Sequence, residues 1–316
     1  MYHPYFRGKQ YELITIRESA PLLHAAGFVP IIEPVKQSLG ALQKTLAVVR
    51  DTGGKAVVIA NPFHGDHSTD GESISKLLAD DCANYPDISV GVLLKESTDL
   101  HDIVAFCDAH EGHKIALIHA GFANAKDLAS ALGDRVAVMT HLFFDGMSGK
   151  LYQKHFSDGT RVLLRDGFQR RRNRDHPDVE FFSDLHATFA DEGMNGFGDF
   201  LIVGDDYSES GGPAYAVAIH LTFIDDGKDD EMHIFHFKSD RQDTPTDPAG
   251  KFAEALQKLI DQLGKPDNKI KETQAISEFR ELHRRGHFPG LGYVKKLSMK
   301  HHIETLALYF AEQGEQ

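Results

Sequence analysis

Short apolar segments rich in β-branched residues recur along the first half of this chain, each bounded by Gly, Pro, Asn or Asp. Such near-continuous apolar runs are typical of strands in a parallel sheet that is covered on both faces, because neither face meets water. The first five cover residues 29–35, 55–60, 88–94, 114–120 and 135–141. No other feature of the sequence constrains the fold as strongly.

Helical segments with one apolar face separate these runs. Behind Ser38, apolar residues recur at three- and four-residue steps over residues 39–49, and the same spacing returns over residues 100–107. Right-handed crossovers between parallel strands place successive strands side by side. We therefore expect an α/β fold that is (β/α)-barrel-like, or TIM-barrel-like, with an open doubly wound sheet as the alternative.

The second half of the sequence is less regular. Its predicted elements are strands at 161–165 and 200–203, a β-hairpin of 214–224 with 231–237, a helix over 252–263 and a helix that begins near His301. We find no internal repeat and no long linker, so we expect a single α/β domain over residues 1–316.

Composition limits the class of protein. The 316 residues are 41% hydrophobic and 26% charged, which is typical of a water-soluble globular protein. No apolar run approaches the roughly 18 residues of a bilayer span, and the N-terminus lacks a signal-peptide pattern, so we expect a cytoplasmic protein without a membrane partner. Cys82 and Cys107 are too few for a disulfide framework. The net charge of −13 disfavours nonspecific binding of nucleic acid.

The sequence lacks several common motifs. It has no Gly-x-x-x-x-Gly-Lys-Ser/Thr, no Gly-x-Gly-x-x-Gly after a strand and no Gly-x-Ser-x-Gly. The common nucleotide hydrolases and dinucleotide oxidoreductases are therefore disfavoured.

Polar side chains follow nearly every predicted strand. In a barrel the loops after the strands converge, so these residues would share one mouth suited to an anion, a divalent metal or acid/base chemistry. We predict ligand-binding roles for Glu33, Lys95, His119, His141, Arg165 and Asp166, catalytic roles for His64 and Asp66, and metal-ligating roles for Asp205 and Glu209 in the acidic loop 204–212. Helix capping and loop solvation are the alternative explanation for each residue taken singly.

The predicted hairpin carries a second group of candidates. Period-two alternation puts His220 at the end of a stripe of alanines, Ala214, Ala216 and Ala218, which we call the alanine stripe. Either a packed helix or a ligand must cover it. The same rule predicts that His236 and Lys238 point in one direction. Together they could bind an anionic ligand such as phosphate. The alternative is an exposed edge strand that is protected by its lysine. We predict catalytic roles for His220, His236 and Lys238.

Two clusters of basic residues complete the set of candidates. The arginines among residues 170–174 could hold a phosphate or meet acidic patches of this protein or of a partner. His301 and His302, at the expected helix start, could contact an anion through free backbone N–H groups.

Several motifs resemble those of the bacterial and phage beta protein family, and within it the uncharacterised sce7725-type proteins. They span almost the entire chain: Tyr5-Phe6-Arg7-Gly8-Lys9-Gln10-Tyr11-Glu12, Pro30-Ile31-Ile32-Glu33-Pro34, Phe182-Ser183-Asp184-Leu185-His186, Gly196-Phe197-Gly198-Asp199-Phe200, residues 211–222 and His301-His302-Ile303. The resemblance implies a compact, barrel-like domain. It also implies a nuclease-like companion protein, in a two-component system that defends bacteria against phage or other foreign DNA.

Two functional hypotheses follow. The first is that the protein recognises an anionic ligand or a protein partner at the mouth formed by the strand ends. The alternative is a metal-assisted phosphoesterase or nuclease-type hydrolase, with a divalent metal as cofactor and His64, Asp66, Asp205, Glu209 and His236 as ligands or acid/base groups.

Overall fold

The computed structural model describes residues 1–209, 212 and 214–314, which form two compact units. The first, which we call the barrel unit, comprises Met1–Asp166 and Thr188–Asp199. The second, the hairpin unit, comprises Gly167–Ala187 and Phe200–Gln316. Whether the two behave as the single domain predicted from the sequence stays a prediction.

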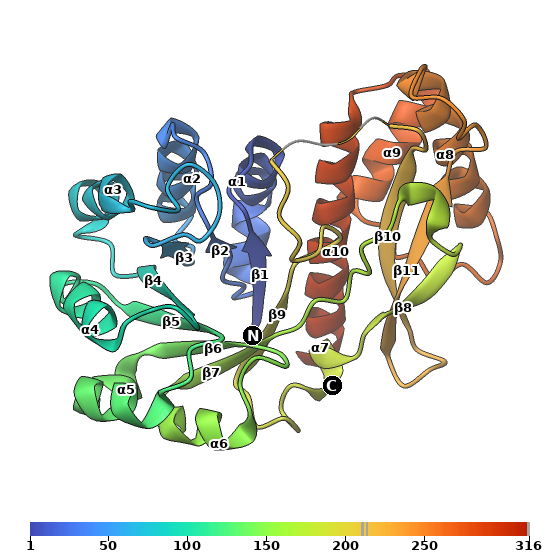
Figure 1. Ribbon diagram of the computed structural model, residues 1–316. Helices are drawn as coiled ribbons and strands as arrows, with labels where there is room; N and C mark the ends of the chain where they lie inside the picture. Colours follow the sequence, from blue (N-terminus) through green and yellow to red (C-terminus); the bar gives the residue numbers. More distant parts are fainter. Residues whose placement is uncertain (210–211, 213, 315–316) are drawn as a thin grey trace. The chain divides into compact units, whose positions relative to one another are not determined.

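Eight parallel strands close into a barrel in the first unit (Figure 1), which confirms the predicted TIM-barrel-like fold. The last strand, β9, pairs with both β7 and β1, so the sheet has no free edge and the open-sheet alternative is wrong. The strands are β1 (Tyr2–Phe6), β2 (Ile31–Ile32), β3 (Ala56–Ile59), β4 (Ile88–Lys95), β5 (Ile115–Ala120), β6 (Thr140–Phe144), β7 (Thr160–Leu164) and β9 (Gly196–Asp199).

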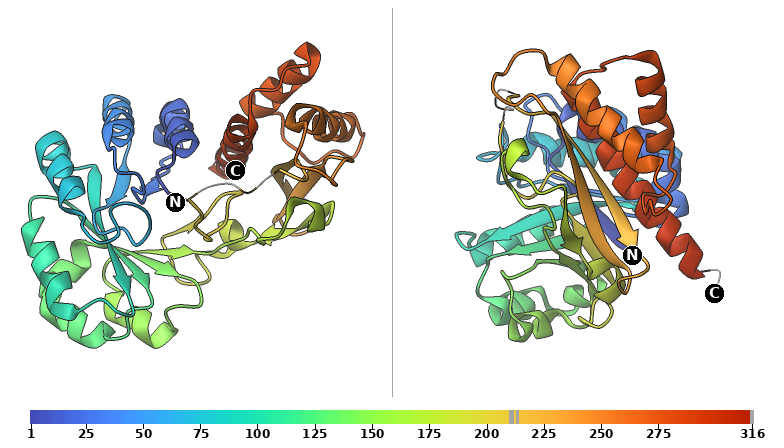
Figure 2. Two further views of the ribbon diagram at one scale, coloured as in Figure 1. Left: turned by 45° about the horizontal axis from the view of Figure 1, so that its top comes forward. Right: turned by 90° about the vertical axis from the view of Figure 1, so that its right-hand side faces the viewer.

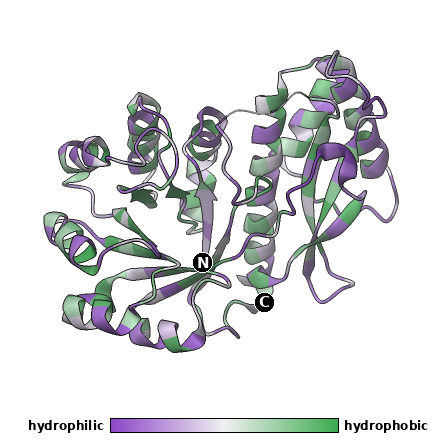
Figure 3. Cartoon of the chain, in the orientation of Figure 1, coloured by the Kyte–Doolittle hydropathy of each residue, from purple (hydrophilic) through white to green (hydrophobic). Residues whose placement is uncertain are grey.

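Helices and short 3₁₀ turns follow most of the barrel strands. Figure 3 shows several barrel strands as largely hydrophobic, although β1 is not. On the helices, hydrophobic and hydrophilic residues alternate, as expected when each helix buries one face. The helical elements are α1 (Gln10–Ala25), α2 (Gly40–Asp51), α3 (Glu72–Cys82), α4 (Leu100–Ala109), α5 (Ala125–Leu132), η1 (Gly133–Val138), α6 (Lys150–Gln153) and η2 (Lys154–Phe156).

Two predicted strands are misplaced along the sequence. Residues 135–141 were expected to form one strand, but most of them belong to η1, and β6 instead runs on through the aromatic end of the apolar segment. Residues 200–203 form a turn after β9. In β9 a Cβ on Gly198 would lie 2.2 Å from the carbonyl oxygen of His3, so barrel closure requires glycines that weaken the sequence signal of a strand.

The hairpin unit is built on a three-stranded antiparallel sheet in the order β10-β11-β8 (Figure 2). It confirms the predicted hairpin and adds β8, which was not predicted. Its elements are η3 (Asn173–Asp175), β8 (Val179–Ser183), β10 (Ala218–Asp225), β11 (Glu231–Lys238), α8 (Pro248–Leu263), α9 (Gln274–Arg285) and α10 (Leu291–Gly314), and the short α7 (Leu185–Thr188) leads back to the barrel unit.

One face of β10 supplies the core of the hairpin unit. The buried side chains of Val217, Ile219 and Leu221 pack with the apolar faces of α8 and α9. Helix α8 begins where the Asp247 carboxylate accepts a hydrogen bond of 2.9 Å from the backbone N–H of Gly250, with Pro248 at the first helical position. No helix in the described parts of the chain is long and apolar enough to cross a bilayer.

Candidate functional site

Glu33 anchors a buried network at the carboxyl ends of the barrel strands. Its carboxylate accepts hydrogen bonds from the Tyr5 hydroxyl (2.9 Å), the His64 ring (3.2 Å) and the backbone N–H groups of Phe63 and His64, and it forms an ion pair with Arg7. Burial would raise the pKa of Glu33, but the hydrogen bond from His64 and the charge of Arg7 lower it to about 2. This arrangement joins two strands to the loop after β3.

The other residues predicted at the strand ends make contacts of their own. The Lys95 ammonium lies 4.4 Å from the centre of the Phe63 ring, and Arg165 donates a hydrogen bond of 2.6 Å to Asp145. Asp66 accepts a hydrogen bond of 2.7 Å from the Gln37 backbone. Asp166 is exposed at the last residue of the first barrel segment.

His119 and His141 do not lie at the mouth, so that prediction is wrong. Both rings are buried beside Phe143, Tyr152 and Phe156, under the helical layer that follows β5 and β6. The reason is the alternation of side chains along a strand, which turns these two positions away from the barrel interior. The His119 ring bonds the Tyr152 hydroxyl (2.7 Å), and the His141 ring bonds the Val136 carbonyl (3.0 Å).

His301 and His302 do not lie at a helix start, so the anion site predicted there is wrong. Helix α10 begins ten residues earlier, at Leu291, and both rings are fully buried in its middle. His301 bonds the Thr222 carbonyl (2.9 Å) and the Thr273 hydroxyl (2.9 Å), and His302 bonds the Thr222 hydroxyl (2.9 Å). The pair fixes α10 to β10.

The acidic loop 204–212 contains Asp205, which is half-buried, and Glu209, which is exposed. Ser210 and Gly211 of this loop lie outside the described residues, as does Pro213. Within the described part of the chain, the group of His, Cys, Asp or Glu side chains with the spacing of a metal site includes neither Asp205 nor Glu209.

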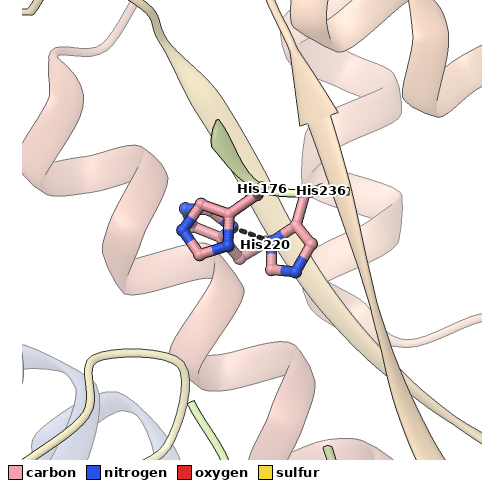
Figure 4. A group of neighbouring side chains, drawn as sticks. All are labelled: His176, His220 and His236. Carbon is pink, nitrogen blue, oxygen red and sulfur yellow. Dashed lines mark hydrogen bonds between the residues drawn. The ribbon is translucent and has the colours of Figure 1, made fainter. Parts of the chain in front are cut away.

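That group consists of His176, His220 and His236 in the hairpin unit, which we call the imidazole cluster (Figure 4). One ring nitrogen from each residue lies within 4.8 Å of the other two. The Nδ1 atoms of His220 and His236 are 2.6 Å apart across the hairpin, where these residues face each other in register. The rings of His176 and His236 stack with their centres 4.2 Å apart.

Glu180 on β8 orients two of the three rings. Its Oε1 accepts a hydrogen bond from Nε2 of His236 (3.0 Å) and a longer one from Nδ1 of His176 (3.4 Å). Burial would raise the pKa of Glu180, but hydrogen bonds from Arg171 and His176 lower it, so the carboxylate is charged at neutral pH. Both carboxylate oxygens lie 2.7 Å from the Arg171 guanidinium.

The imidazoles of the cluster are neutral at pH 7. Burial and the neighbouring His176 lower the pKa of His236 to about 4, although Glu180 opposes this. The pKa of His220 also lies well below its usual value, mainly because of burial and secondly because of the neighbouring His236 and His176. Neutral imidazole is the form that binds metal ions.

Lys238, also predicted as catalytic, is a neighbour of the cluster and not a member. Its ammonium group donates a hydrogen bond to the backbone carbonyl of His176 and lies 3.2 Å from the Asp178 carboxylate. It therefore fixes the segment that carries His176.

A cavity of about 700 Å³, which we call the arginine cavity, opens beside the cluster. His220 and Phe168 line it, and the Phe168 ring contacts all three imidazoles with centres 5.2 to 6.2 Å away. Its other lining residues are Arg171, Arg172, Asn173, Arg174, Ile202, Val203, Gly212, Ala214, Tyr215, Ala216, Val217, Ala218, Leu291, Val294, Lys295 and Ser298. The alanine stripe thus faces both a cavity and helix α10.

The cationic wall of the arginine cavity is held in place by contacts to the hairpin. The Asn173 amide donates to the Ala216 carbonyl (2.9 Å), which ties the arginine segment to the approach to β10. On that approach, the buried Lys251 ammonium donates to the carbonyls of Ala214 (3.1 Å) and Tyr215 (2.7 Å). The cavity walls are therefore ordered by specific bonds.

Sequence reasoning missed His176 and Glu180. His176 lies in the turn between the arginine run and an unpredicted strand, and only the pairing of β8 with β11 brings Glu180 beside His236. The one available signal was a histidine four residues before a glutamate, directly after the basic run.

Comparison with models of known protein families and with curated proteins gave no match for this chain. The resemblance to the sce7725-type beta proteins, and the nuclease-like companion it implies, therefore stay predictions.

Proposed function

We propose that the protein binds an anionic, phosphate-bearing ligand in the arginine cavity. The observation that carries this proposal is the charge of the lining, which includes four cations, Arg171, Arg172, Arg174 and Lys295, and no carboxylate among its described residues. Guanidinium groups match the geometry of phosphate oxygens and bind them through charge-assisted hydrogen bonds.

Arg172 is the cation best placed to bind such a ligand. Arg171 is bonded to Glu180, and Arg174 lies 3.7 Å from Asp175. The Arg172 carbonyl accepts a hydrogen bond from the Asp175 backbone, but its guanidinium has no ion-pair or hydrogen-bond partner among the described residues. This guanidinium therefore need not exchange one partner for another when an anion binds.

The remaining walls favour a ligand that also has an apolar or aromatic part. The alanine stripe, Ile202 and Val294 give an apolar surface, and Tyr215 presents a ring that is 46% exposed. A volume of this size is in the usual range for small-molecule sites. A mononucleotide or a similar phosphate ester combines both features.

Binding is tested by calorimetry with ATP, AMP and inorganic pyrophosphate in the presence of EDTA. Arg172→Ala should weaken the Kd about tenfold or more, since a hydrogen bond to a charged group contributes about 1.5–3 kcal/mol. Arg170→Ala is the matched control, because Arg170 belongs to the same basic run but pairs with Asp206 and does not line the cavity. No binding at millimolar concentration, or equal losses in both variants, would contradict the proposal.

A second candidate function is metal-assisted hydrolysis of a phosphoester at the same place. The observation that favours it is that His220 belongs both to the cavity wall and to the imidazole cluster. A water oxygen would attack phosphorus, the bond from phosphorus to the ester oxygen would break, and the proton from water would pass to the departing alcohol.

Turnover of bis(p-nitrophenyl) phosphate in the presence of Zn²⁺ or Mn²⁺, and its loss in EDTA, is the expected result. His220→Asn should abolish the activity, whereas Arg170→Ala should retain it. Activity that survives His220→Asn would place hydrolysis elsewhere and would leave the binding proposal intact.

A further inference from the structure

We propose that His176, His220 and His236 hold one divalent transition metal ion of the zinc class. This inference goes beyond ligand binding in the arginine cavity and does not depend on it. Neutral imidazole is a preferred ligand of zinc, copper, nickel and iron, whereas magnesium and calcium prefer oxygen ligands.

The spacing of the three ring nitrogens fits such an ion. Zinc binds imidazole nitrogen at about 2.0–2.1 Å in tetrahedral geometry, which places the nitrogens of two ligands about 3.3 Å apart. The atoms of the imidazole cluster lie within 4.8 Å of one another, and those of His220 and His236 are 2.6 Å apart. The contact between these two atoms is a hydrogen bond in which Nδ1 of His220 donates to Nδ1 of His236. Metal binding would replace this bond: the His220 proton would move to Nε2, and small side-chain rotations would bring all three nitrogens to bonding distance.

The hydrogen bonds of Glu180 leave the required lone pairs directed away from it. With a charged carboxylate as acceptor, His236 carries its proton on Nε2 and His176 carries its proton on Nδ1. The lone pairs then lie on Nδ1 of His236 and on Nε2 of His176. A carboxylate behind the histidine is the common outer partner of imidazole ligands to zinc.

Nε2 of His176 is the second, independent sign of a missing ligand. The His176 side chain is 1% exposed, and this nitrogen has no hydrogen-bond partner in the described part of the chain. A buried polar atom without a partner costs free energy, and a bound metal ion would remove that cost.

Three protein ligands leave one position open, as in catalytic zinc sites. Because His220 lines the arginine cavity, we place the open position on the cavity side, where water or an anion would complete the coordination. Lys238, bonded to the His176 carbonyl, acts as a positioning residue for the cluster.

The test uses the untagged full chain, stripped with EDTA, dialysed and titrated with Zn²⁺ by calorimetry and with Co²⁺ by visible absorption, with chloride as the only anion. We expect one ion per chain and the intense Co²⁺ bands of four-coordinate geometry. His236→Ala should abolish binding, and Glu180→Gln should weaken it roughly 10- to 100-fold, as loss of an outer partner does.

His233→Ala is the matched control, since His233 is buried on the same strand but bonds Glu231 and stands outside the cluster. It should bind the metal as the wild type does. If His236→Ala does not fold, judged by circular dichroism, His220→Asn at a half-buried position takes its place. The absence of stoichiometric binding, or equal losses in the cluster and control variants, overturns the proposal. Anion binding is measured in EDTA, so the failure of either proposal is visible separately.

Discussion

Two sets of buried histidines, one in each unit, use the same chemical group with opposite results. In the barrel unit the Tyr152 hydroxyl donates to Nδ1 of His119, Nε2 of His119 donates to Nδ1 of His141, and Nε2 of His141 donates to the Val136 carbonyl. Every ring nitrogen has one partner, and the chain ends on a neutral carbonyl. Such a network has no capacity left for a ligand.

In the hairpin unit the corresponding network ends on the charged Glu180 and leaves Nε2 of His176 without a partner among the described residues. It also adjoins a cavity, through His220. Burial of a histidine is therefore no sign of function in this protein. What indicates a binding site is a buried ring nitrogen to which the fold gives no hydrogen-bond partner.

Replacement of one histidine in each set by leucine tests this comparison most directly. His141→Leu leaves Nε2–H of His119 and the Val136 carbonyl unsatisfied, at about 1–3 kcal/mol each, so we expect a loss of about 2–6 kcal/mol in the free energy of unfolding. His176→Leu removes one long hydrogen bond and a nitrogen that had no partner, so we expect a change within about 1 kcal/mol.

Both variants are compared with the wild type by urea unfolding in EDTA, so that no metal contributes to stability. Equal losses in the two variants would break the comparison, because His176 would then support the fold as His141 does.

The sequence predicted parallel strands covered on both faces, because such strands leave a near-continuous apolar signal. That signal fits a barrel and an open doubly wound sheet alike, and the pairing of β9 with β1 and β7 decides for the barrel. The prediction failed where closure requires glycine, as in β9, and where the apolar run continued beyond the predicted boundary, as in β6. For β9 the contact that decides the strand is with β1, at the other end of the barrel sequence.

The site was predicted only in part. His220 and His236 were identified as candidates from strand alternation; that they face each other across the hairpin was not predicted and comes from the register of β10 and β11. His176 and Glu180 were missed, because the pairing of β8 with β11 decides their position and β8 was not predicted.

His119 and His141 show the limit of reasoning from strand ends. A residue one position earlier or later on a strand points to the other face, so an uncertainty of one residue moves a side chain from the mouth to the layer under the helices. His301 and His302 were misplaced for a different reason: their helix begins at Leu291, ten residues before the predicted start.

The pH dependence of stability gives a second, smaller test of the barrel set. Burial lowers the pKa of His141 from 6.5 to about 4, so the unfolded chain binds more protons than the folded chain between these values. The free energy of unfolding must therefore fall as the pH is lowered through this window. His141→Gln should remove up to about 3 kcal/mol of that fall, at about 1.4 kcal/mol for each pKa unit.

The measurement is urea unfolding in EDTA at several values between pH 7 and pH 4, read as the slope for each variant rather than the absolute stability. Buried histidines that do not contact His141 remain unchanged in the variant, so their contributions cancel in the difference. His119 bonds His141, so the difference in slope reports on this pair. His101→Gln, at an exposed position on α4, should keep the wild-type slope. A wild-type slope in His141→Gln would mean that the folded barrel unit takes up a proton at His141 as readily as the unfolded chain does. The hydrogen-bond network of His119 and His141 would then not be closed to an added charge, and the contrast with the imidazole cluster would be lost.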